Sequence, residues 1–279
     1  MIIAVLIVLG LCMGSFVNAL VWRLHEQAAE VGKKKPDQQY LQRLSISRGR
    51  SMCSHCHHEL TALDLIPVVS WLVLRGKCRY CDHPIPDTPL PELGTSLLFV
   101  LSYIYWPQEL AGIEYAVFGL WLVLLVSFMA LIVYDARWML LPSKVIYPTG
   151  AVAALLAALE VASASNPARA VLYTALSIGL GGGIFWLIYK ISDGKWIGYG
   201  DVRLGWIFGA VVGAPQYSVM VIFFASLLGC VVALPFVFSK RLKGSSLIPF
   251  GPFLIVATII VKLFGVSILH WYEHVLLLS

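Results

Sequence analysis

Long apolar runs separated by short polar loops dominate the chain. A helix needs about 20 mainly apolar residues to cross the hydrocarbon core of a bilayer. Runs of this kind lie at roughly 1–22, 90–107, 114–134, 145–163, 168–190, 202–214, 215–238 and 250–270. The pattern predicts about eight transmembrane helices. Seven helices or a re-entrant segment also fit, because the run at 202–214 is short and polar residues interrupt the run at 90–107.

Composition leads to the same fold class. Of the 279 residues, 59% are hydrophobic and 13% are charged, and the mean hydropathy is +0.83. This is far too apolar for an ordinary soluble domain. We therefore expect an all-α polytopic membrane protein. No basic residue precedes the apolar stretch of the first run, which favours a retained first helix over a cleaved signal peptide.

Basic residues gather on one side of the predicted topology. Ten of the twenty Lys and Arg residues lie between the first two runs, and with eight spans eight more fall in loops on that side. Loops rich in Lys and Arg stay in the cytoplasm, so this face is expected to be cytoplasmic. The net charge of +5 follows from the topology and suits anionic lipid. It gives no support for nucleic-acid binding.

The one long polar stretch divides the chain. We expect a first transmembrane helix at 1–22, a cytoplasmic insert at 23–89 and a helical membrane domain at 90–279. The insert has a charged part, 26–50, followed by a part that bears cysteines.

Four of the six cysteines form two pairs with the spacing of a zinc site. Cys53 and Cys56 make one Cys-x2-Cys pair, and Cys78 and Cys81 make the second, twenty-one residues later. Four thiolates at such spacing bind zinc tetrahedrally, in a closed structural site. Two disulfides or free thiols are the alternative, but a cytoplasmic compartment keeps thiols reduced. The prediction is a zinc-ribbon-like insert.

Other residues of the insert have plainer interpretations. The nearby histidines are expected to be solvated, since four cysteines already complete a site; they are His55, His57, His58 and His83. The apolar segment 63–74 is too short to span a membrane. It either lies on the membrane surface or against helix ends, or forms a small core element of the zinc module. Cys12 and Cys230 are expected to pack within apolar helices.

Two aspartates stand where apolar runs meet polar loops. Asp135 ends the third run, and Asp201 opens the sixth within Gly198-Tyr199-Gly200-Asp201. Both belong to the predicted cytoplasmic edge. Ionisable groups at membrane depth are costly and usually functional. Two neighbouring carboxylates share one proton and act together as acid and base, as in aspartic proteases.

Each aspartate also has a purely structural interpretation. Asp201 can cap its own helix, and Asp135 can pair with Arg137 or Lys144. Gly198 and Gly200 let the backbone turn at the helix entrance and let a substrate backbone come close. The pair within this glycine frame favours the functional interpretation over the structural one.

The ordered motifs resemble the type IV prepilin peptidases, membrane aspartic proteases of the Gly-x-Gly-Asp type. The resemblance covers most of the chain. It rests on Gly14-Ser15-Phe16-Val17-Asn18 with Arg23-Leu24, the cysteine pairs around 61–67 and 70–72, Pro91-Glu92-Leu93, Asp135 ahead of Leu141-Pro142, the Gly-x-Gly-Asp tetrapeptide and residues 248–253.

The resemblance implies that Asp135 and Asp201 are the catalytic pair. They would cut the basic leader from prepilins or pseudopilins at the cytoplasmic face of the bacterial inner membrane. Many members also N-methylate the new N-terminus, usually Phe, with S-adenosylmethionine, an activity associated with the insert. No methyl-donor contact can be assigned from the sequence. Glu92 is a candidate, and an interfacial charge near a helix start is its equal alternative.

Some features depart from the family or leave other functions open. Ser143 stands where the family commonly has Asp after Leu-Pro, which removes an acid near the pair. A peptidase that lacks methylation, or an intramembrane protease for other signal-like helices, is the nearest alternative. A proton- or ion-coupled transporter is a third hypothesis. It gives the cysteine pairs no role, and we see no inverted repeat.

Overall fold

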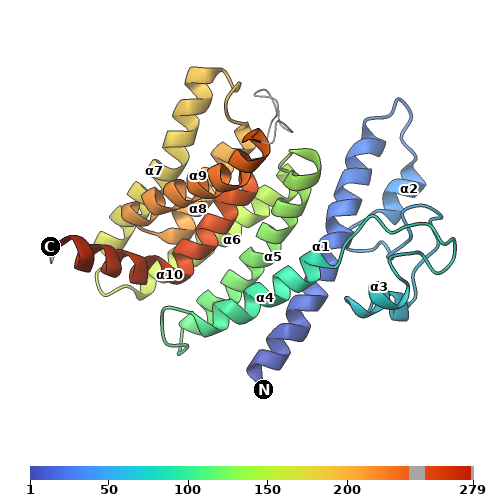
Figure 1. Ribbon diagram of the computed structural model, residues 1–279, viewed down its shortest axis with the longest axis horizontal. Helices are drawn as coiled ribbons and strands as arrows, with labels where there is room; N and C mark the ends of the chain where they lie inside the picture. The colour runs from blue at the N-terminus through green and yellow to red at the C-terminus, as the bar shows by residue number, and fades with distance from the viewer. Residues whose placement is uncertain (239–248, 278–279) are drawn as a thin grey trace. The chain divides into compact units, whose positions relative to one another are not determined.

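The computed structural model describes residues 1–238 and 249–277 of the chain. All named elements in these ranges are helical, and the only β-pairing there consists of two isolated bridges. This confirms the all-α prediction. The chain forms two compact units, Met1–Ile104 and Tyr105–Ser279, whose helices are labelled in Figure 1. The division falls one helix later than the boundary at 89/90 expected from the sequence.

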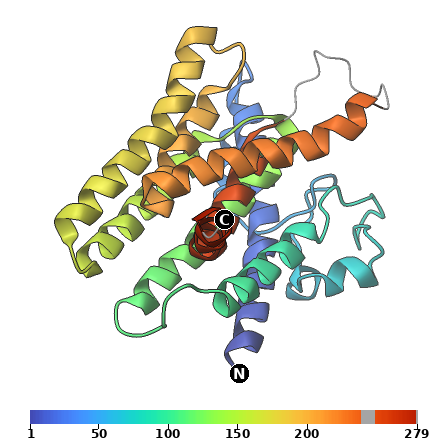
Figure 2. The ribbon, with the colours of Figure 1, turned by 60° about the vertical axis from the view of Figure 1, so that its left-hand side comes forward.

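The first unit consists of two long helices and an insert. The helices are α1 (Ile2–Val31) and α4 (Leu90–Ile104), and the insert holds α2 (Gln38–Arg43), η1 (Ala62–Leu65) and α3 (Val69–Val73). Figure 2 shows the insert beside α1. The helix α1 continues to Val31, beyond the predicted membrane span at 1–22, because good helix formers such as Leu24, Gln27 and Ala28 follow that span.

The charged part of the insert is tied to α1. The Arg23 guanidinium donates to the carbonyls of Ser45 at 2.9 Å and Gly49 at 3.0 Å. Asp37 caps α2 by accepting backbone N–H groups, and Glu30 in turn accepts the N–H of Asp37 at 2.9 Å. The buried Arg23 is therefore satisfied by backbone carbonyls, as a buried charge requires.

Close packing of α4 on α1 explains why α4 belongs to the first unit. Gly14 lies directly against α4, where a Cβ would stand 2.3 Å from the Cα of Glu92. Gly10 makes the same close approach to Ser96. Small residues four apart let two helix backbones meet, and Figure 1 shows that α4 crosses α1.

The apolar segment 63–74 forms the short helices η1 and α3. Its side chains point outward to a large extent: Leu63 is 68% exposed, Leu72 60% and Val73 70%. The segment is therefore not the buried core of the cysteine module. Trp71 is an exception, since its indole N–H donates to the Asp87 carbonyl at 3.1 Å.

Over its described residues, the second unit is a bundle of six helices. They are α5 (Glu114–Trp138), α6 (Ser143–Ser163), α7 (Pro167–Ser192), α8 (Tyr199–Val212), α9 (Pro215–Phe238) and α10 (Gly251–Leu277). The short α8 contacts α6, α7, α9 and α10, and most of its residues are buried. It ends at Gly213, whose φ of +68° suits glycine. The core of the unit surrounds α8, which carries Asp201.

Six helices in the described residues are long and apolar enough to cross a membrane: α1, α5, α6, α7, α9 and α10. The remaining two predicted spans, α4 and α8, have 15 and 14 residues. At 1.5 Å per residue each is only about 20 Å long, shorter than the hydrocarbon core. The chain is a multi-pass membrane protein with about the predicted number of helices.

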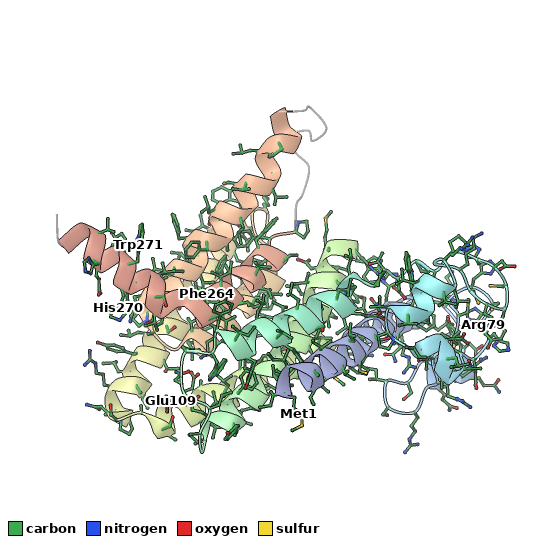
Figure 3. All side chains as sticks on the ribbon, turned by 60° about the horizontal axis from the view of Figure 1, so that its bottom comes forward. Met1, Arg79, Glu109, Phe264, His270 and Trp271 are labelled. Atoms are coloured by element: carbon green, nitrogen blue, oxygen red, sulfur yellow. The ribbon has the colours of Figure 1, made fainter. Side chains whose placement is uncertain are left out.

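The outer faces of the long helices are apolar, as side chains in contact with lipid should be. Exposed examples are Val171, Leu187 and Phe223. The C-terminal part of α10 carries Trp271, which is 65% exposed and is labelled in Figure 3. Tryptophan is typical of membrane interfaces, where an apolar ring and a polar N–H are both accommodated.

Candidate functional site

Asp135 is buried in the last turn of α5, where only 5% of the residue is exposed. Its carboxylate accepts a hydrogen bond from the backbone N–H of Gly251, the first residue of α10. The N–H groups of a first helical turn have no partner within their own helix and favour a negative charge. The start of α10 is thus one source of stabilisation for an ionised Asp135.

Asp201 lies in the first turn of α8. Gly198 is the N-cap residue, and the side chain of Asp201 accepts the backbone N–H of Gly198. The expected helix cap is therefore present, although Asp201 caps from the third position of the helix rather than from the N-cap itself. This role occupies one hydrogen-bond acceptor, and a carboxylate has about four.

The two aspartates line the same cavity, which has a volume of about 650 Å³. The cavity is formed by the ends of α5 and α7, the loop 194–198, the start of α8, part of α9 and residues 249–250. Its walls include Phe185, Ile188 and Phe250. Asp135 and Asp201 are close enough to repel each other when both are charged. The sequence-predicted pair is thus brought together from two helices within the second unit.

The loop after Asp135 packs against the glycine frame of Asp201. A Cβ on Gly200 would stand 2.8 Å from Cδ1 of Leu141. Beside it, Ser143 accepts a hydrogen bond from Nη1 of Arg203 at 2.8 Å. Ser143, where the family commonly has Asp, therefore holds an arginine of α8 without adding an acid to the cavity.

The cysteines form two similar loops in the first unit. Cys53 donates its backbone N–H to the carbonyl of His58 at 3.0 Å, and Cys78 does the same to His83 at 2.9 Å. The Sγ of Cys53 accepts a backbone N–H two residues on, at 3.4 Å, and the Sγ of Cys78 does so at 3.5 Å. An isolated antiparallel bridge closes each loop.

The four thiols converge on one point. The sulfurs of Cys53, Cys56, Cys78 and Cys81 all lie within 4.8 Å of one another, and Cys53 and Cys81 are 3.9 Å apart. A disulfide has an S–S distance of about 2.05 Å, so these cysteines are free. Tetrahedral bonds of about 2.3 Å to a zinc ion would place sulfurs about 3.8 Å apart. The cluster can bind a metal ion.

Histidines and a tyrosine connect the two cysteine loops. The ring of His55 stacks on His83 with centroids 3.9 Å apart, and His58 stacks on Tyr80 at 3.7 Å. The metal-ligand cluster found in the described residues contains the four cysteines and no histidine. These histidines are exposed loop residues, as the sequence predicts, and their stacked rings also pack one loop against the other.

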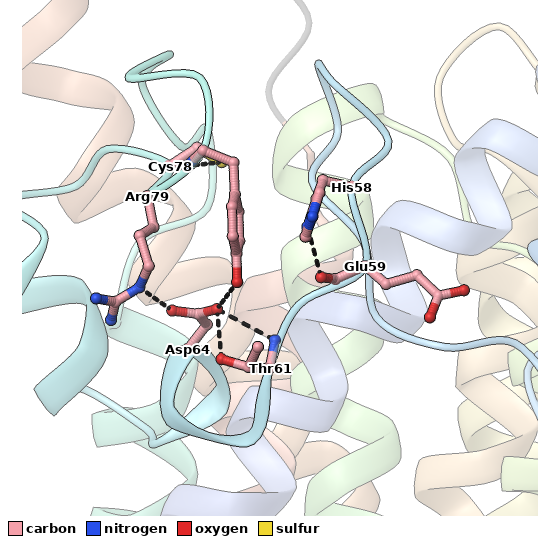
Figure 4. Close-up of polar contacts among 7 residues, drawn as sticks. His58, Glu59, Thr61, Asp64, Cys78 and Arg79 are labelled. Atoms are coloured by element: carbon pink, nitrogen blue, oxygen red, sulfur yellow. Dashed lines mark hydrogen bonds and ion pairs between the residues drawn. The ribbon is translucent and has the colours of Figure 1, made fainter.

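Asp64 ties η1 to the second cysteine loop, as Figure 4 shows. It accepts hydrogen bonds from Arg79 Nε at 2.7 Å, Thr61 Oγ1 at 2.8 Å and the Tyr80 hydroxyl at 3.1 Å. Burial alone would raise the pKa of Asp64, but these donors outweigh it and lower the pKa to about 2. The carboxylate is ionised at neutral pH and supports the loop structurally.

Glu92 and Asn18 line one cavity of the first unit. Glu92 is buried at the start of α4 and accepts the backbone N–H of Val68 at 2.6 Å. Glu92 lies in the first turn of α4, as the interfacial-charge alternative expects, and it is also buried and hydrogen-bonded. Sequence reasoning gave Asn18 no role, and the contact between Asp135 and Gly251 was also missed. The only sequence signals for Asn18 and for this contact were the family motifs at Gly14–Asn18 and at 248–253.

Both units match known protein families. Residues 8–106 match the bacterial peptidase A24 N-terminal domain, and residues 122–234 match the type IV leader peptidase family. The first match ends within two residues of the boundary between the two compact units. No solved structure matches the chain.

Curated relatives resemble this chain over nearly its full length. A prepilin leader peptidase/N-methyltransferase of Aeromonas hydrophila is 32% identical over 94% of this chain and 91% of its own. One from Burkholderia pseudomallei is 33% identical, over 90% and 82%. A type 4 prepilin-like proteins leader peptide-processing enzyme of Escherichia coli is 32% identical over 87% of both chains. This chain belongs to the type IV leader peptidase family, the prepilin peptidases.

Proposed function

We propose that this protein is an aspartic endopeptidase that removes the basic leader from type IV prepilins or pseudopilins. The observation that carries the proposal is the cavity in which Asp135 and Asp201 meet. Membership of the prepilin peptidase family supplies the substrate class. The pair acts in the bacterial inner membrane, at its cytoplasmic face, because the basic loops predict that orientation.

The proposed chemistry uses one ionised and one protonated carboxylate. Two carboxylates in one site cannot both ionise cheaply, so they share a proton. The ionised member draws a proton from a water molecule, which attacks the carbonyl carbon of the scissile peptide. The protonated member stabilises the developing oxyanion by donating to it. The N–H groups of Gly198 and Gly251 hold the two carboxylates in place for these proton transfers.

We further propose that the protein methylates the new N-terminus of its product. Relatives over nearly the whole chain carry the name N-methyltransferase. S-adenosylmethionine would supply the methyl group, which it carries on a sulfonium sulfur. The metal ion of the cysteine cluster would be zinc, because four thiolates in tetrahedral positions are typical of structural zinc. Its role would be to hold the insert together, since four protein ligands leave no open position.

A peptidase without methylation is the nearest alternative, since one relative is named only for leader-peptide processing. Mass spectrometry of a prepilin processed by the purified protein with S-adenosylmethionine separates the two. The proposal expects a product that is shorter by the leader and heavier by one methyl group at its N-terminus. A cleaved but unmethylated product would support the alternative, and an uncleaved prepilin would contradict both. Family membership leaves the transporter hypothesis without a specific observation in its favour.

A further inference from the structure

A second cavity lies wholly within the first unit and has no part in the proposed cleavage. Its volume is about 160 Å³. It is bounded by α1, the cysteine loops, α3 and the start of α4, and apolar walls include Trp22, Trp71 and Leu74. A cavity of about this size holds a benzene ring in a protein interior. The space therefore suits one amino-acid side chain and its backbone end.

Glu92 lies in the wall of this cavity, 8% exposed. Its Oε2 accepts the backbone N–H of Val68 at 2.6 Å, and Ser15 also hydrogen-bonds to the carboxylate. Val68 has a φ of +62°, a region that branched side chains rarely adopt. Such strain concentrates at functional sites and persists only where surrounding contacts impose it. The hydrogen bond to Glu92 is one such contact.

Asn18 contributes a second acceptor to the same cavity. Its Nδ2 donates to the carbonyl of Thr88 at 3.1 Å, which orients the amide. Its Oδ1 is the one buried side-chain oxygen or nitrogen without a hydrogen-bond partner among the described residues, and the residue is only 9% exposed. A buried carbonyl without a donor is costly. A ligand that donates hydrogen bonds would remove that cost.

The charges around the cavity favour a cation. Its lining includes two basic residues and three acidic ones. Arg23 is hydrogen-bonded to backbone carbonyls, and Arg79 is paired with Asp64. The other acids are Asp87 and Glu92. The formal charges of these five side chains therefore sum to −1. Among them, Glu92 is a buried carboxylate with no basic partner in the described ion pairs.

We propose that this cavity binds a primary ammonium group carried on an amino-acid-sized apolar moiety, with Glu92 and Asn18 as its acceptors. The inference rests on the proposed methylation, which involves two such groups. One is the new N-terminus of the cleaved substrate, and the other is the amino-acid end of the sulfonium donor. The same three donor hydrogens would satisfy Glu92 and Asn18 in either case.

The proposed methyl transfer takes place between the substrate nitrogen and the sulfonium donor. The substrate ammonium would first lose a proton to water, and the nitrogen lone pair would then form a bond to the methyl carbon. The bond between that carbon and the sulfonium sulfur breaks, and its electron pair stays on sulfur to leave a thioether. Glu92 and Asn18 are required only to bind and orient an ammonium group before the transfer.

Titration calorimetry on the full chain in detergent tests the proposal without any turnover. The two probes are a short peptide amide with a free N-terminal Phe and S-adenosylhomocysteine. Each is compared with its N-acetylated form, which has no ammonium group. For the probe that uses the cavity, Glu92→Gln should weaken binding about tenfold to a hundredfold, as expected for a hydrogen bond to a charged group. Asn18→Ala should weaken binding of the same probe.

Two features of the design separate the loss of the Glu92 charge from misfolding of the variant. Gln at position 92 can still accept the N–H of Val68 and has nearly the same shape. Glu59→Gln removes a half-exposed carboxylate of the same insert that lies outside the cavity, and it should bind both probes as the wild type does. If Glu92→Gln loses affinity for the peptide, the cavity binds the new N-terminus of the substrate. If it loses affinity for S-adenosylhomocysteine, the cavity binds the methyl donor. Both results support the proposal.

The proposal is overturned if Glu92→Gln binds both probes with wild-type affinity, or if acetylation leaves the wild-type affinities unchanged. Failure of the proposed methylation has a different signature, because it is read from the mass of the wild-type product. A methylated product with unaltered binding to Glu92→Gln would reject only the cavity. An unmethylated product with ammonium binding that depends on Glu92 would reject only the methylation.

Discussion

The first residue of α10, Gly251, lies directly against the carboxylate of Asp135. Its backbone N–H donates to that carboxylate, and a Cβ at this position would stand 2.6 Å from Oδ2 of Asp135. Only glycine therefore allows both the hydrogen bond and the observed place of the carboxylate. The start of α8 holds Asp201 in a similar way through Gly198. Each acid of the pair is thus positioned by the N-terminal end of a helix.

Gly251→Ala should displace the Asp135 carboxylate and slow leader cleavage. A misplacement of about 1 Å can reduce a rate by about a hundredfold. The measurement is kcat for cleavage of a prepilin, together with the melting temperature of the variant. Gly119→Ala in α5 is the control, since its Cβ would meet nothing within 4 Å, and it should cleave at the wild-type rate. A fully active Gly251→Ala enzyme would show that this contact does not position Asp135.

An ion pair between a buried lysine and a partly buried glutamate joins α10 to α6. Lys262 Nζ lies 2.5 Å from Glu160 Oε1 and 3.0 Å from the Val211 carbonyl, and its side chain is 9% exposed. Lys262→Met should destabilise the protein by about 3–5 kcal/mol, because it leaves Glu160 partly buried without its partner. Adding Glu160→Gln should recover part of that loss. Lys33→Met removes a surface lysine and should leave the free energy of unfolding nearly unchanged.

Unfolding of these variants in detergent gives the comparison. The pair is unimportant for stability if Lys262→Met and Lys33→Met have the same free energy of unfolding. It is not a coupled pair if the effects of the two substitutions at 262 and 160 simply add.

The lowered pKa of Asp64 predicts a pH dependence of the insert. The folded pKa is about 2, below the ordinary value of 3.8. The stabilisation from an ionised Asp64 is therefore complete above about pH 4 and is lost as the pH falls towards 2. Asp64→Asn should reduce the hydrogen-exchange protection of residues 51–89 near pH 6. The difference from the wild type should shrink as the pH falls below about 4, and a constant difference down to pH 2 would contradict the assignment.

The cysteine cluster should bind one zinc ion per chain. Cys53→Ser with Cys78→Ser removes one thiolate from each loop and should abolish zinc in elemental analysis of the purified protein. It should also reduce methylation. Cys12→Ser with Cys230→Ser alters two exposed cysteines outside the cluster and should retain the metal. Purified wild-type protein without zinc would refute the site.

Much of the architecture follows from sequence patterns that act locally. The helices formed where the apolar runs predicted them, because a membrane span requires a long run of its own. The cysteine pairs formed similar loops because a Cys-x2-Cys segment is a local turn. Asp135 and Asp201 were found from their positions at loop edges. Their meeting in one cavity depended on the packing of α8, which no local pattern specifies.

The features that sequence reasoning missed depend on long-range packing. The apolar run that contains Lys262 has the pattern of an ordinary membrane helix. Nothing in that run identifies Glu160, 102 residues away, as the ion-pair partner of Lys262. The pairing of α4 with α1 depends on Gly10 and Gly14, whose small size matters only once the facing helix is known. The unusual backbone conformation at Val68 accompanies the hydrogen bond from its N–H to Glu92, and no local pattern of residues specifies either.

Cleavage by the aspartate pair is the central claim, and single substitutions test it most directly. Asp135→Asn and Asp201→Asn preserve shape but remove the acid and base functions. We expect each variant to insert and fold with wild-type thermal stability or better, since burying a carboxylate is costly, and to leave a purified prepilin uncleaved. The measurement is the rate of leader removal by mass spectrometry. Processing at the wild-type rate by either variant would contradict the account.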